Sequence, residues 1–348
     1  MSCETVVIGL NWVGDNVLAI PTYKALQHRF RSEGGIAVAA PANVAALLDA
    51  SGLFKQVIPW NGSTRKRIAA LRAAGSFKRA VILPNSFRAA MVTFAARIEE
   101  RWGYPTDLRR ILLTHPIARP ETRGHQLDDY TPLLAALNAP RVVDDTPSIK
   151  LPPAIREYGK RRLLEIGMHL DRPILAIHAG GLYGRAKHWG DARYIDTIKM
   201  LRLEGFDVVL LTSPGEREQA ERIATTCNGV PIVGHDGDVL QLAAALSQCA
   251  ALITNDSGPL HVAAALAVPS VSIFGPTDPD RTVIAGATHV LRSTLACQPC
   301  YQRECPLRHH RCMSDVSVDD VFTAAVSLVS GFVPEVSAHP IEVPIIGA

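Results

Sequence analysis

Short runs of consecutive apolar residues alternate with longer segments in which apolar positions recur every three to four residues. The short runs predict strands buried on both faces of a sheet, and the longer segments predict helices. The predicted strands are Thr5–Leu10, Ile36–Ala39, Arg79–Leu83, Pro173–His178, Phe206–Thr212, Ala250–Thr254 and Ser270–Phe274. The predicted helices are Asn16–Phe30, Ala154–Gly167, Asp191–Glu204, Gly215–Cys227, Val239–Gln248, Gly258–Ala267 and Val318–Ser330. This alternation predicts βαβ units, and therefore an α/β fold with parallel sheets covered by helices on both faces.

The alternation weakens between Pro140 and Pro153, where Pro, Asp and Thr accumulate, and a new strand begins at Pro173. A chain of 348 residues suits two domains of ordinary size. We therefore predict two Rossmann-like, doubly wound domains, 1–170 and 171–348, that face each other across a cleft. The residues after Gly331 are rich in Pro, and the sequence assigns them no role.

Composition is that of a globular chain, because 47% hydrophobic and 20% charged residues leave ample apolar material to bury. The longest apolar stretch, His261–Phe274, is interrupted by Pro269 and is shorter than the ~20 residues that span a bilayer. The N-terminus does not match a signal peptide, since Glu4 stands where a basic region belongs. We therefore expect a cytoplasmic protein, whose seven cysteines are not a disulfide framework.

The net charge of +3 hides an asymmetry. Residues 51–98 carry nine basic residues and no acidic residue, so the rest of the chain is at −6. The nine are Lys55, Arg65, Lys66, Arg67, Arg72, Lys78, Arg79, Arg88 and Arg97. This segment predicts a positive surface on the N-terminal half and therefore an anionic partner. The charge pattern alone does not distinguish nucleic acid, a lipid head group and a phosphorylated sugar as that partner.

The turn after the first predicted strand carries the first candidate for chemistry. Gly9 and Gly14 permit a tight turn and a close approach to the backbone, but their spacing is not that of a dinucleotide-binding G-x-G-x-x-G motif. Asp15 is predicted at or next to the start of the following helix, facing the cleft. Two interpretations remain open for Asp15, a helix cap or a reactive carboxylate.

Two turns in the C-terminal half are suited to bind phosphate. Gly180 and its neighbouring glycine follow a predicted strand, and Lys187 lies in the basic cluster beyond them. Ser257 and Gly258 lie at the start of a predicted helix, where free amides and the positive end of the helix dipole attract anions. The first turn is also consistent with a solvated loop.

Further polar residues gather around these turns. Asp256 precedes the phosphate-binding helix start and is interpreted as a partner for sugar hydroxyls or as a cap. His261 lies one turn into that helix, as a site residue or a core histidine. Thr277 belongs to a rigid Gly-Pro-Thr turn, and Glu216 follows a Pro-Gly turn where its carboxylate can accept hydrogen bonds from ribose hydroxyls.

Four cysteines lie close together near the C-terminus, with two histidines beside them. Their spacing resembles a zinc site, although the second pair is not C-x2-C, and reduced thiols in a compact loop are the alternative. Any metal there would be structural. The four are Cys297, Cys300, Cys305 and Cys312.

A family resemblance rests on six motifs in the same order along the chain. They are Trp12–Asp15, Leu83–Arg88, His125–Tyr130, Lys187–Trp189, Asn255–Ala265 and Gly275–Pro279. They resemble the motifs of the ADP-heptose:lipopolysaccharide heptosyltransferases, most of all the heptosyltransferase II branch. The resemblance implies a glycosyltransferase-B fold, with the acceptor on the N-terminal domain and the nucleotide sugar on the C-terminal domain.

The implied activity is inverting transfer of L-glycero-D-manno-heptose from ADP-heptose to the inner core of lipopolysaccharide. The resemblance implies that Asp15 is the general base and that Lys187 holds the diphosphate. The other candidate donor-binding residues are Gly180, Glu216, Asp256, Ser257, Gly258, His261 and Thr277. The candidate acceptor-binding residues are Asn11, Trp12, Arg65, Lys66, Arg67 and Arg88. The positive charges of the last four would meet the carboxylates and phosphates of the inner core. No cofactor and no catalytic metal are expected.

Other functions stay open at this point. Asn11 and Asn16 depart from the family pattern, so a transferase with another donor or acceptor is one alternative. A nucleotide-sugar epimerase is another, although it would leave the basic N-terminal surface without a purpose. A non-catalytic binder of polysaccharide or nucleic acid is a third, and the aromatic content of 6% offers few platforms for base stacking. We expect no nucleic acid partner, and peripheral contact with the inner face of the inner membrane.

Overall fold

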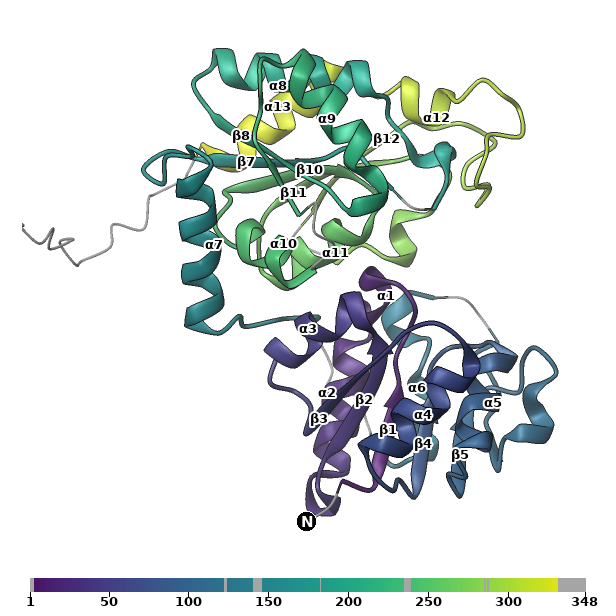
Figure 1. The fold of residues 1–348 in the computed structure, drawn as a ribbon. Coiled ribbons are helices and arrows are strands. Elements are labelled where there is room, and N and C mark those ends of the chain that lie inside the picture. Colours follow the sequence, from purple (N-terminus) through teal and green to yellow (C-terminus); the bar gives the residue numbers. More distant parts are fainter. Residues whose placement is uncertain are drawn as a thin grey trace, which may run out of the picture.

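The structure is a computed structural model that describes residues 3–121, 124–139, 146–181, 183–234, 239–284, 286 and 288–330. This part of the chain forms two six-stranded parallel sheets, each in its own lobe (Figure 1). The first sheet has the order β3-β2-β1-β4-β5-β6 and the second the order β12-β11-β10-β7-β8-β9. Each order is that of a Rossmann-type sheet, so the predicted pair of doubly wound sheets is confirmed.

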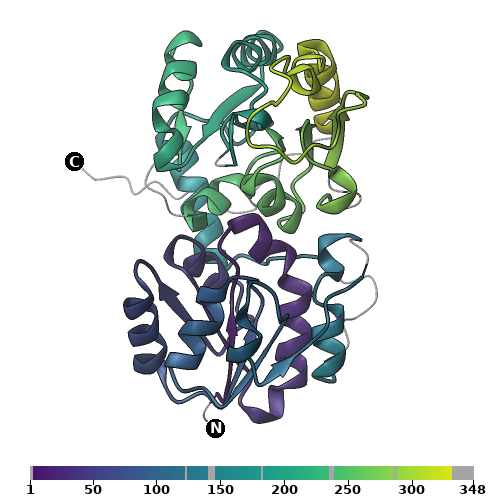
Figure 2. The same cartoon turned by 90° about the vertical axis from the view of Figure 1, so that its right-hand side faces the viewer.

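Helices cover both faces of each sheet (Figure 2). The strands are β1 (Thr5–Ile8), β2 (Ile36–Pro41), β3 (Gln56–Trp60), β4 (Arg79–Ile82), β5 (Glu100–Gly103), β6 (His115–Pro116), β7 (Ile174–His178), β8 (Asp207–Leu211), β9 (Ile232–Val233), β10 (Ala251–Asn255), β11 (Ser270–Phe274) and β12 (Thr288–Arg292). The helices are α1 (Val13–Leu18), α2 (Ile20–Arg29), α3 (Ala42–Ala50), α4 (Thr64–Ala74), α5 (Phe87–Ala95), α6 (Thr131–Ala136), α7 (Pro153–Glu165), α8 (Asp191–Leu203), α9 (Arg217–Thr226), α10 (Val239–Leu246), α11 (Gly258–Ala265), α12 (Arg311–Ser314) and α13 (Val318–Val329). None of these described helices is long and apolar enough to cross a bilayer.

Every predicted strand is present, but the apolar pattern missed β3, β5, β6, β9 and β12. Four of the missed strands are sheet edges, where one side has no neighbour and polar residues or prolines are tolerated, and the fifth, β5, lies next to an edge. Pro59 within β3 is one example. The strands that were predicted are almost continuously buried, as in β1 and β10.

The first predicted helix, Asn16–Phe30, is wrong in its start and its continuity. Helix α1 already begins at Val13, and the chain then starts α2 anew after Ala19. Pro21 explains the break, because it has no amide hydrogen to donate and its ring crowds the preceding turn. The earlier start moves Asp15 inside the first turn of α1.

One hydrophobic core runs across both lobes. Helix α7 precedes the predicted domain boundary at residue 170, yet it packs against α10 of the C-terminal lobe, and α10 also contacts α3 (Figure 1). Leu163 of α7 is fully buried in this shared core, together with Leu47 of α3 and Leu246 of α10. The boundary at residue 170 stays a prediction. The segment 140–145 that suggested it and the tail from Gly331 onward lie outside the described residues.

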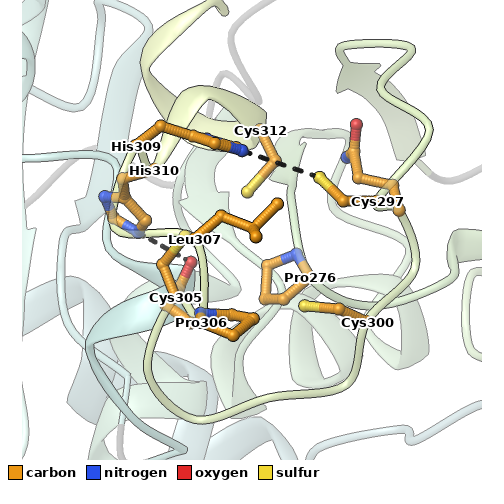
Figure 3. Close-up of a pocket in the computed structure, with 11 residues that line it drawn as sticks. Pro276, Cys297, Cys300, Cys305, Pro306, Leu307, His309, His310 and Cys312 are labelled. Atoms are coloured by element: carbon orange, nitrogen blue, oxygen red, sulfur yellow. Dashed lines mark hydrogen bonds between the residues drawn. The ribbon is translucent and has the colours of Figure 1, made fainter.

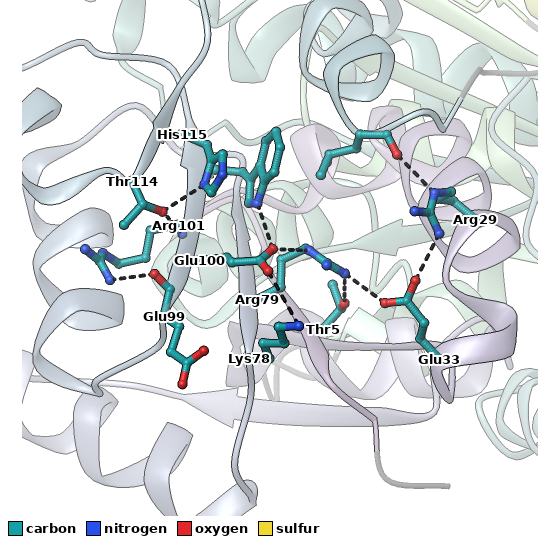
Figure 4. A network of polar contacts seen from close by, with 12 residues as sticks. Thr5, Arg29, Glu33, Lys78, Arg79, Glu99, Glu100, Arg101, Thr114 and His115 are labelled. Carbon is teal, nitrogen blue, oxygen red and sulfur yellow. Dashed lines mark hydrogen bonds and ion pairs between the residues drawn. The ribbon is translucent and has the colours of Figure 1, made fainter.

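The basic segment is less uniformly positive than its sequence suggests. Arg79 bonds Glu100 Oε2 at 2.7 Å and Glu33 Oε2 at 3.0 Å, two carboxylates from outside the segment (Figure 4). Lys78 lies 3.9 Å from Glu100 Oε1. Charge at this end of the sheet is therefore compensated internally. The basic residues of α4 and α5, described below, remain available to an anionic partner.

Candidate functional site

Asp15 lies in the first turn of α1, which stands between the two lobes (Figure 1). Its Oδ1 accepts a hydrogen bond from Gln126 Nε2 at 2.9 Å. Burial raises the pKa of the Asp15 carboxyl, while the Gln126 bond and the charges of His261 and Lys187 act against that rise. A carboxylate of this kind is suited to general base catalysis. The interpretation of Asp15 as a cap is wrong, because Trp12 occupies the N-cap position of α1.

Asn16 braces the loop that presents Asp15. Its amide nitrogen donates to the carbonyl oxygens of Leu10 and Trp12, both at 2.8 Å. Its Oδ1 accepts from the Leu10 amide at 3.1 Å and from the Tyr23 hydroxyl at 2.8 Å. Asn16 is fully buried, so these bonds satisfy its side chain and hold the β1–α1 loop in one conformation.

Lys187 and Asp256 form a buried ion pair in the C-terminal lobe. Lys187 Nζ lies 2.5 Å from Asp256 Oδ2, which also accepts from Thr277 Oγ1 at 2.7 Å. Asp256 Oδ1 lies 3.9 Å from His261 Nε2. Burial disfavours the ionised form of Asp256, but the charges of Lys187 and His261 outweigh it and lower the pKa. Three of the predicted donor-binding residues thus converge on the carboxylate of a fourth, Asp256.

A second polar cluster surrounds Glu216. Its Oε2 lies 3.2 Å from His178 Nε2 and accepts from Ser213 Oγ at 2.6 Å. Burial alone would raise its pKa, but the bond and charge of His178, together with Ser213, lower the pKa of Glu216 to about 2. Ser257 Oγ lies 3.2 Å from the other nitrogen of the His178 ring. A Cβ at Gly180 would collide with the Glu216 carboxylate, so a larger residue there would displace that side chain. Sequence reasoning did not assign His178 a role.

The two lobes meet at this site through α1 and α11. A Cβ at Gly14 would collide with the His261 ring, and one at Gly258 would lie 3.5 Å from Val13 Cβ. Helix α11 begins at Gly258, so its free N-terminal amides point toward the same region. His261 is buried, and burial lowers its pKa, while the charges of Asp256 and Asp15 act against that shift. The contact places Asp15 opposite the Lys187–Asp256 pair.

A segment before α6 also connects the lobes. Asp129 Oδ2 lies 2.6 Å from the guanidinium of Arg281, and His125 Nε2 lies 3.0 Å from the carbonyl oxygen of Val283. Gln126, which contacts Asp15, lies between these two anchors. The motif His125–Tyr130 was noticed in the sequence, but nothing local in it indicates that its glutamine reaches Asp15.

The acceptor candidates lie in two places. Asn11 and Trp12 are exposed on the loop beside Asp15, where Trp12 leaves 53% of its surface to solvent. Arg67 on α4 lies close to Arg88 on α5. Burial and the charge of Arg88 therefore lower the pKa of Arg67. The two remaining candidates, Arg65 and Lys66, are exposed in the first turn of α4.

The four cysteines near the C-terminus surround a small cavity with His309 and His310 (Figure 3). All four are free thiols, and Cys297 Sγ lies 4.0 Å from His309 Nε2. Across the described ranges, no three His, Cys, Asp or Glu side chains are arranged to hold a metal ion, so the zinc interpretation gains no support. The loop instead contacts the segment that carries Lys187. His310 Nε2 lies 3.0 Å from the carbonyl oxygen of Ala186, the residue before Lys187.

Comparison with known proteins identifies the class. Residues 65–310 match glycosyltransferase family 9 (heptosyltransferase), and the chain belongs to this family. It is therefore a glycosyltransferase, and its two lobes form a glycosyltransferase-B fold.

Among its relatives, the lipopolysaccharide heptosyltransferase 2 of Salmonella typhimurium is 28% identical over 94% of this chain and 99% of its own length. The corresponding enzyme of Escherichia coli K12 is 31% identical over 80% of this chain and 84% of its own length. The solved structure of the E. coli ADP-heptose lipopolysaccharide heptosyltransferase II is 27% identical. It aligns with a TM-score of 0.77 over 94% of this chain and 98% of that one.

Proposed function

We propose that this protein is an inverting heptosyltransferase that transfers L-glycero-D-manno-heptose from ADP-heptose to the inner core of lipopolysaccharide. The observation that carries the proposal is the position of Asp15. It belongs to one lobe, and the charges of Lys187, Asp256 and His261 in the other lobe act on its pKa. The names of its relatives support the donor and the acceptor. Membership of a glycosyltransferase family disfavours the epimerase alternative.

Asp15 acts as the base in the proposed reaction. It takes the proton from an acceptor hydroxyl while that oxygen bonds to the anomeric carbon of the heptose. The bond from the anomeric carbon to the phosphate oxygen breaks, and its electron pair leaves with ADP. Attack opposite the leaving group inverts the anomeric configuration. Because burial raises the pKa of Asp15, the carboxylate takes up this proton more readily than an exposed aspartate does.

The C-terminal lobe, residues 171–348, is assigned to the donor. Negative charge grows on the leaving diphosphate, and Lys187 together with the first amides of α11 can stabilise it. Lys187 is paired with Asp256, so the diphosphate would share or replace this partner. Thr277 and Ser257 offer hydroxyls for phosphate or heptose, and Glu216 offers a carboxylate to the ribose.

The N-terminal lobe, residues 1–170, is assigned to the acceptor. Trp12 and Asn11 lie beside the base, where they can contact the sugar that carries the attacking hydroxyl. The arginines of α4 and α5 lie further out and suit the anionic groups of the core. Because this acceptor is built on lipid A, the protein would act at the cytoplasmic face of the inner membrane and contact it peripherally.

Purified protein incubated with ADP-heptose and a heptose-bearing core acceptor tests this function. Mass spectrometry should detect an acceptor that has gained one heptose, and NMR should show the inverted anomer. Asp15→Asn keeps the shape of the side chain, so it should lower kcat by ~10²- to 10⁴-fold while ADP binding persists. Asp196→Asn, an exposed aspartate on α8, serves as the matched control.

Three results would contradict parts of this proposal. Normal turnover in Asp15→Asn would remove Asp15 from the mechanism. Transfer from another nucleotide sugar, with ADP-heptose ignored, would keep the fold and base but replace the donor. Neutralising Arg65, Lys66 and Arg67 should impair acceptor use and leave donor affinity unchanged, so a loss of donor affinity would reverse the assignment of the lobes.

A further inference from the structure

Large apolar side chains are exposed together at one edge of the N-terminal lobe. Leu108 leaves 89% and Ile111 83% of its surface to solvent, and Phe94 on α5 leaves 49%. Leu108 is the N-cap residue of a 3₁₀ turn, Arg109–Leu112, and Ile111 lies within it, so both exposed side chains come from one turn. The turn packs against α5, which brings Phe94 to the same edge. We call Leu108, Ile111 and Phe94 the apolar tip.

The turn that carries the tip is held firmly. Asp107 and Leu108 both have positive φ, at 52° and 57°, a conformation that costs energy for residues other than glycine. Arg109 is fully buried beneath them, where its guanidinium donates to the carbonyl oxygens of Tyr104, at 2.7 Å, and of Pro84. The exposure of Leu108 and Ile111 is therefore built into the fold, because the surrounding structure enforces it.

Arginines surround the tip. Arg88, Arg97 and Arg110 are exposed: Arg110 lies in the same turn as Ile111, Arg97 lines the same hollow as Phe94, and Arg88 lies in the first turn of α5. The Arg101 guanidinium lies 5.4 Å from the centre of the Phe94 ring. Arg101 and Arg72 also line a shallow hollow beside that ring. Glu99 and Asp107 are the acids at this edge, and Asp107 Oδ2 is engaged by the Phe87 amide at 2.6 Å. The tip is thus an apolar centre with a cationic border.

We propose that the apolar tip and its arginines dock on an anionic lipid bilayer, with Leu108 and Ile111 entering the head-group region. Apolar side chains ringed by arginine match this surface, since the guanidinium groups bind lipid phosphates while the apolar groups leave water. This inference rests on the proposed function and deepens it by identifying the membrane-facing side.

The position of the tip agrees with a lipid-linked acceptor. The Asp107–Phe87 hydrogen bond ties the tip to the start of α5, where the acceptor candidate Arg88 lies. Arg88 is in turn close to Arg67 on α4. A protein docked through the tip would have these arginines next to the bilayer. Core sugars that project from the membrane would reach the N-terminal lobe first.

Vesicle flotation with the full chain tests the docking. Vesicles of phosphatidylcholine with phosphatidylglycerol should bind the wild-type protein, and pure phosphatidylcholine vesicles should bind it at least tenfold less. The double variant Leu108→Asn and Ile111→Ser should bind anionic vesicles at least tenfold less, and asparagine tolerates the positive φ at 108. Leu203→Ser, which removes an equally exposed leucine (87%) from α8 of the other lobe, should bind like wild type.

Two outcomes would overturn the docking proposal. One is equal binding of the double variant and wild type to anionic vesicles. The other is absence of wild-type binding to them, which would leave a protein as the occupant of the tip. Thermal unfolding of both variants should match wild type, because the replaced side chains are exposed.

Transferase activity separates this proposal from the proposed function. The double variant should keep its kcat/KM on a water-soluble, deacylated core acceptor within twofold of wild type. It should lose at least tenfold on the same acceptor embedded in vesicles. Equal loss on both acceptors would contradict a membrane role. If wild type transfers heptose to neither acceptor, the proposed function fails, and flotation still decides the docking.

Discussion

Replacing Gln126 by alanine removes the hydrogen bond that Asp15 accepts at 2.9 Å. A hydrogen bond to a charged group contributes ~1.5–3 kcal/mol, and one pKa unit corresponds to ~1.4 kcal/mol. The bond stabilises the ionised form of Asp15, so its loss raises the pKa of the base. Because Asp15 is only half-buried, solvent replaces part of the bond, and we expect a rise of about one unit rather than two.

The dependence of kcat/KM on pH measures this shift. A base must be unprotonated to act, so activity falls on the acid side as Asp15 takes up its proton. In Gln126→Ala the acid limb of the profile should move to higher pH by about one unit, a loss of roughly tenfold at pH values on the limb. On the plateau above it, the two enzymes should have similar rates. Gln248→Ala is the control, because Gln248 donates to Ser247 and not to a carboxylate.

Superimposable acid limbs for wild type and Gln126→Ala would refute this reasoning. A lower plateau with an unmoved limb would also refute it, since Gln126 would then orient a group without affecting ionisation. A shift of the limb in Gln248→Ala would show that the profile reports some other change. Unfolding in urea should be compared for all three proteins, so that a loss of folded enzyme is not counted as a loss of activity.

Lys187→Met should weaken ADP binding by ~10- to 150-fold in calorimetry, since it removes one charge-assisted contact; unchanged affinity would exclude the contact. Asn16→Ala should lower the free energy of unfolding in urea by ~3 kcal/mol, because it leaves buried partners such as the Tyr23 hydroxyl unsatisfied. Because folding lowers the pKa of Glu216 to about 2, its ionised carboxylate stabilises the fold by ~3 kcal/mol above pH 4.5. This contribution is lost as pH falls towards 2. The stability gap between wild type and Glu216→Gln should therefore narrow in acid, and a constant gap would contradict the assignment.

Several site residues could be found without the structure because local sequence marks them. Asp15, Lys187 and Asp256 all follow strands with continuous apolar runs, namely β1, β7 and β10. In a doubly wound sheet these three strands lie at the point where strand order reverses, and ligands bind at that point. Edge strands such as β3 and β12 escaped prediction because an edge position does not demand a buried apolar run.

Partners and protonation required the tertiary structure. Gln126 is 111 residues from Asp15 in the chain, and Arg281 is 152 residues from Asp129. By sequence, Arg79 counts toward a positive surface, but its ion pairs with Glu33 and Glu100 neutralise its charge. The sequence left open whether Asp15 is a cap or a reactive carboxylate. The structure places Trp12 at the N-cap of α1 and Gln126 against the Asp15 carboxylate.

Apolar periodicity is a local property, so the chain alone indicates the buried central strands and the loops that follow them. The charge state of Asp15, the pairing of Lys187 and the exposure of Leu108 arise from burial and from distances between residues far apart in the chain. Those quantities exist only once the two lobes are assembled, because desolvation and Coulomb energy depend on position in space rather than in sequence.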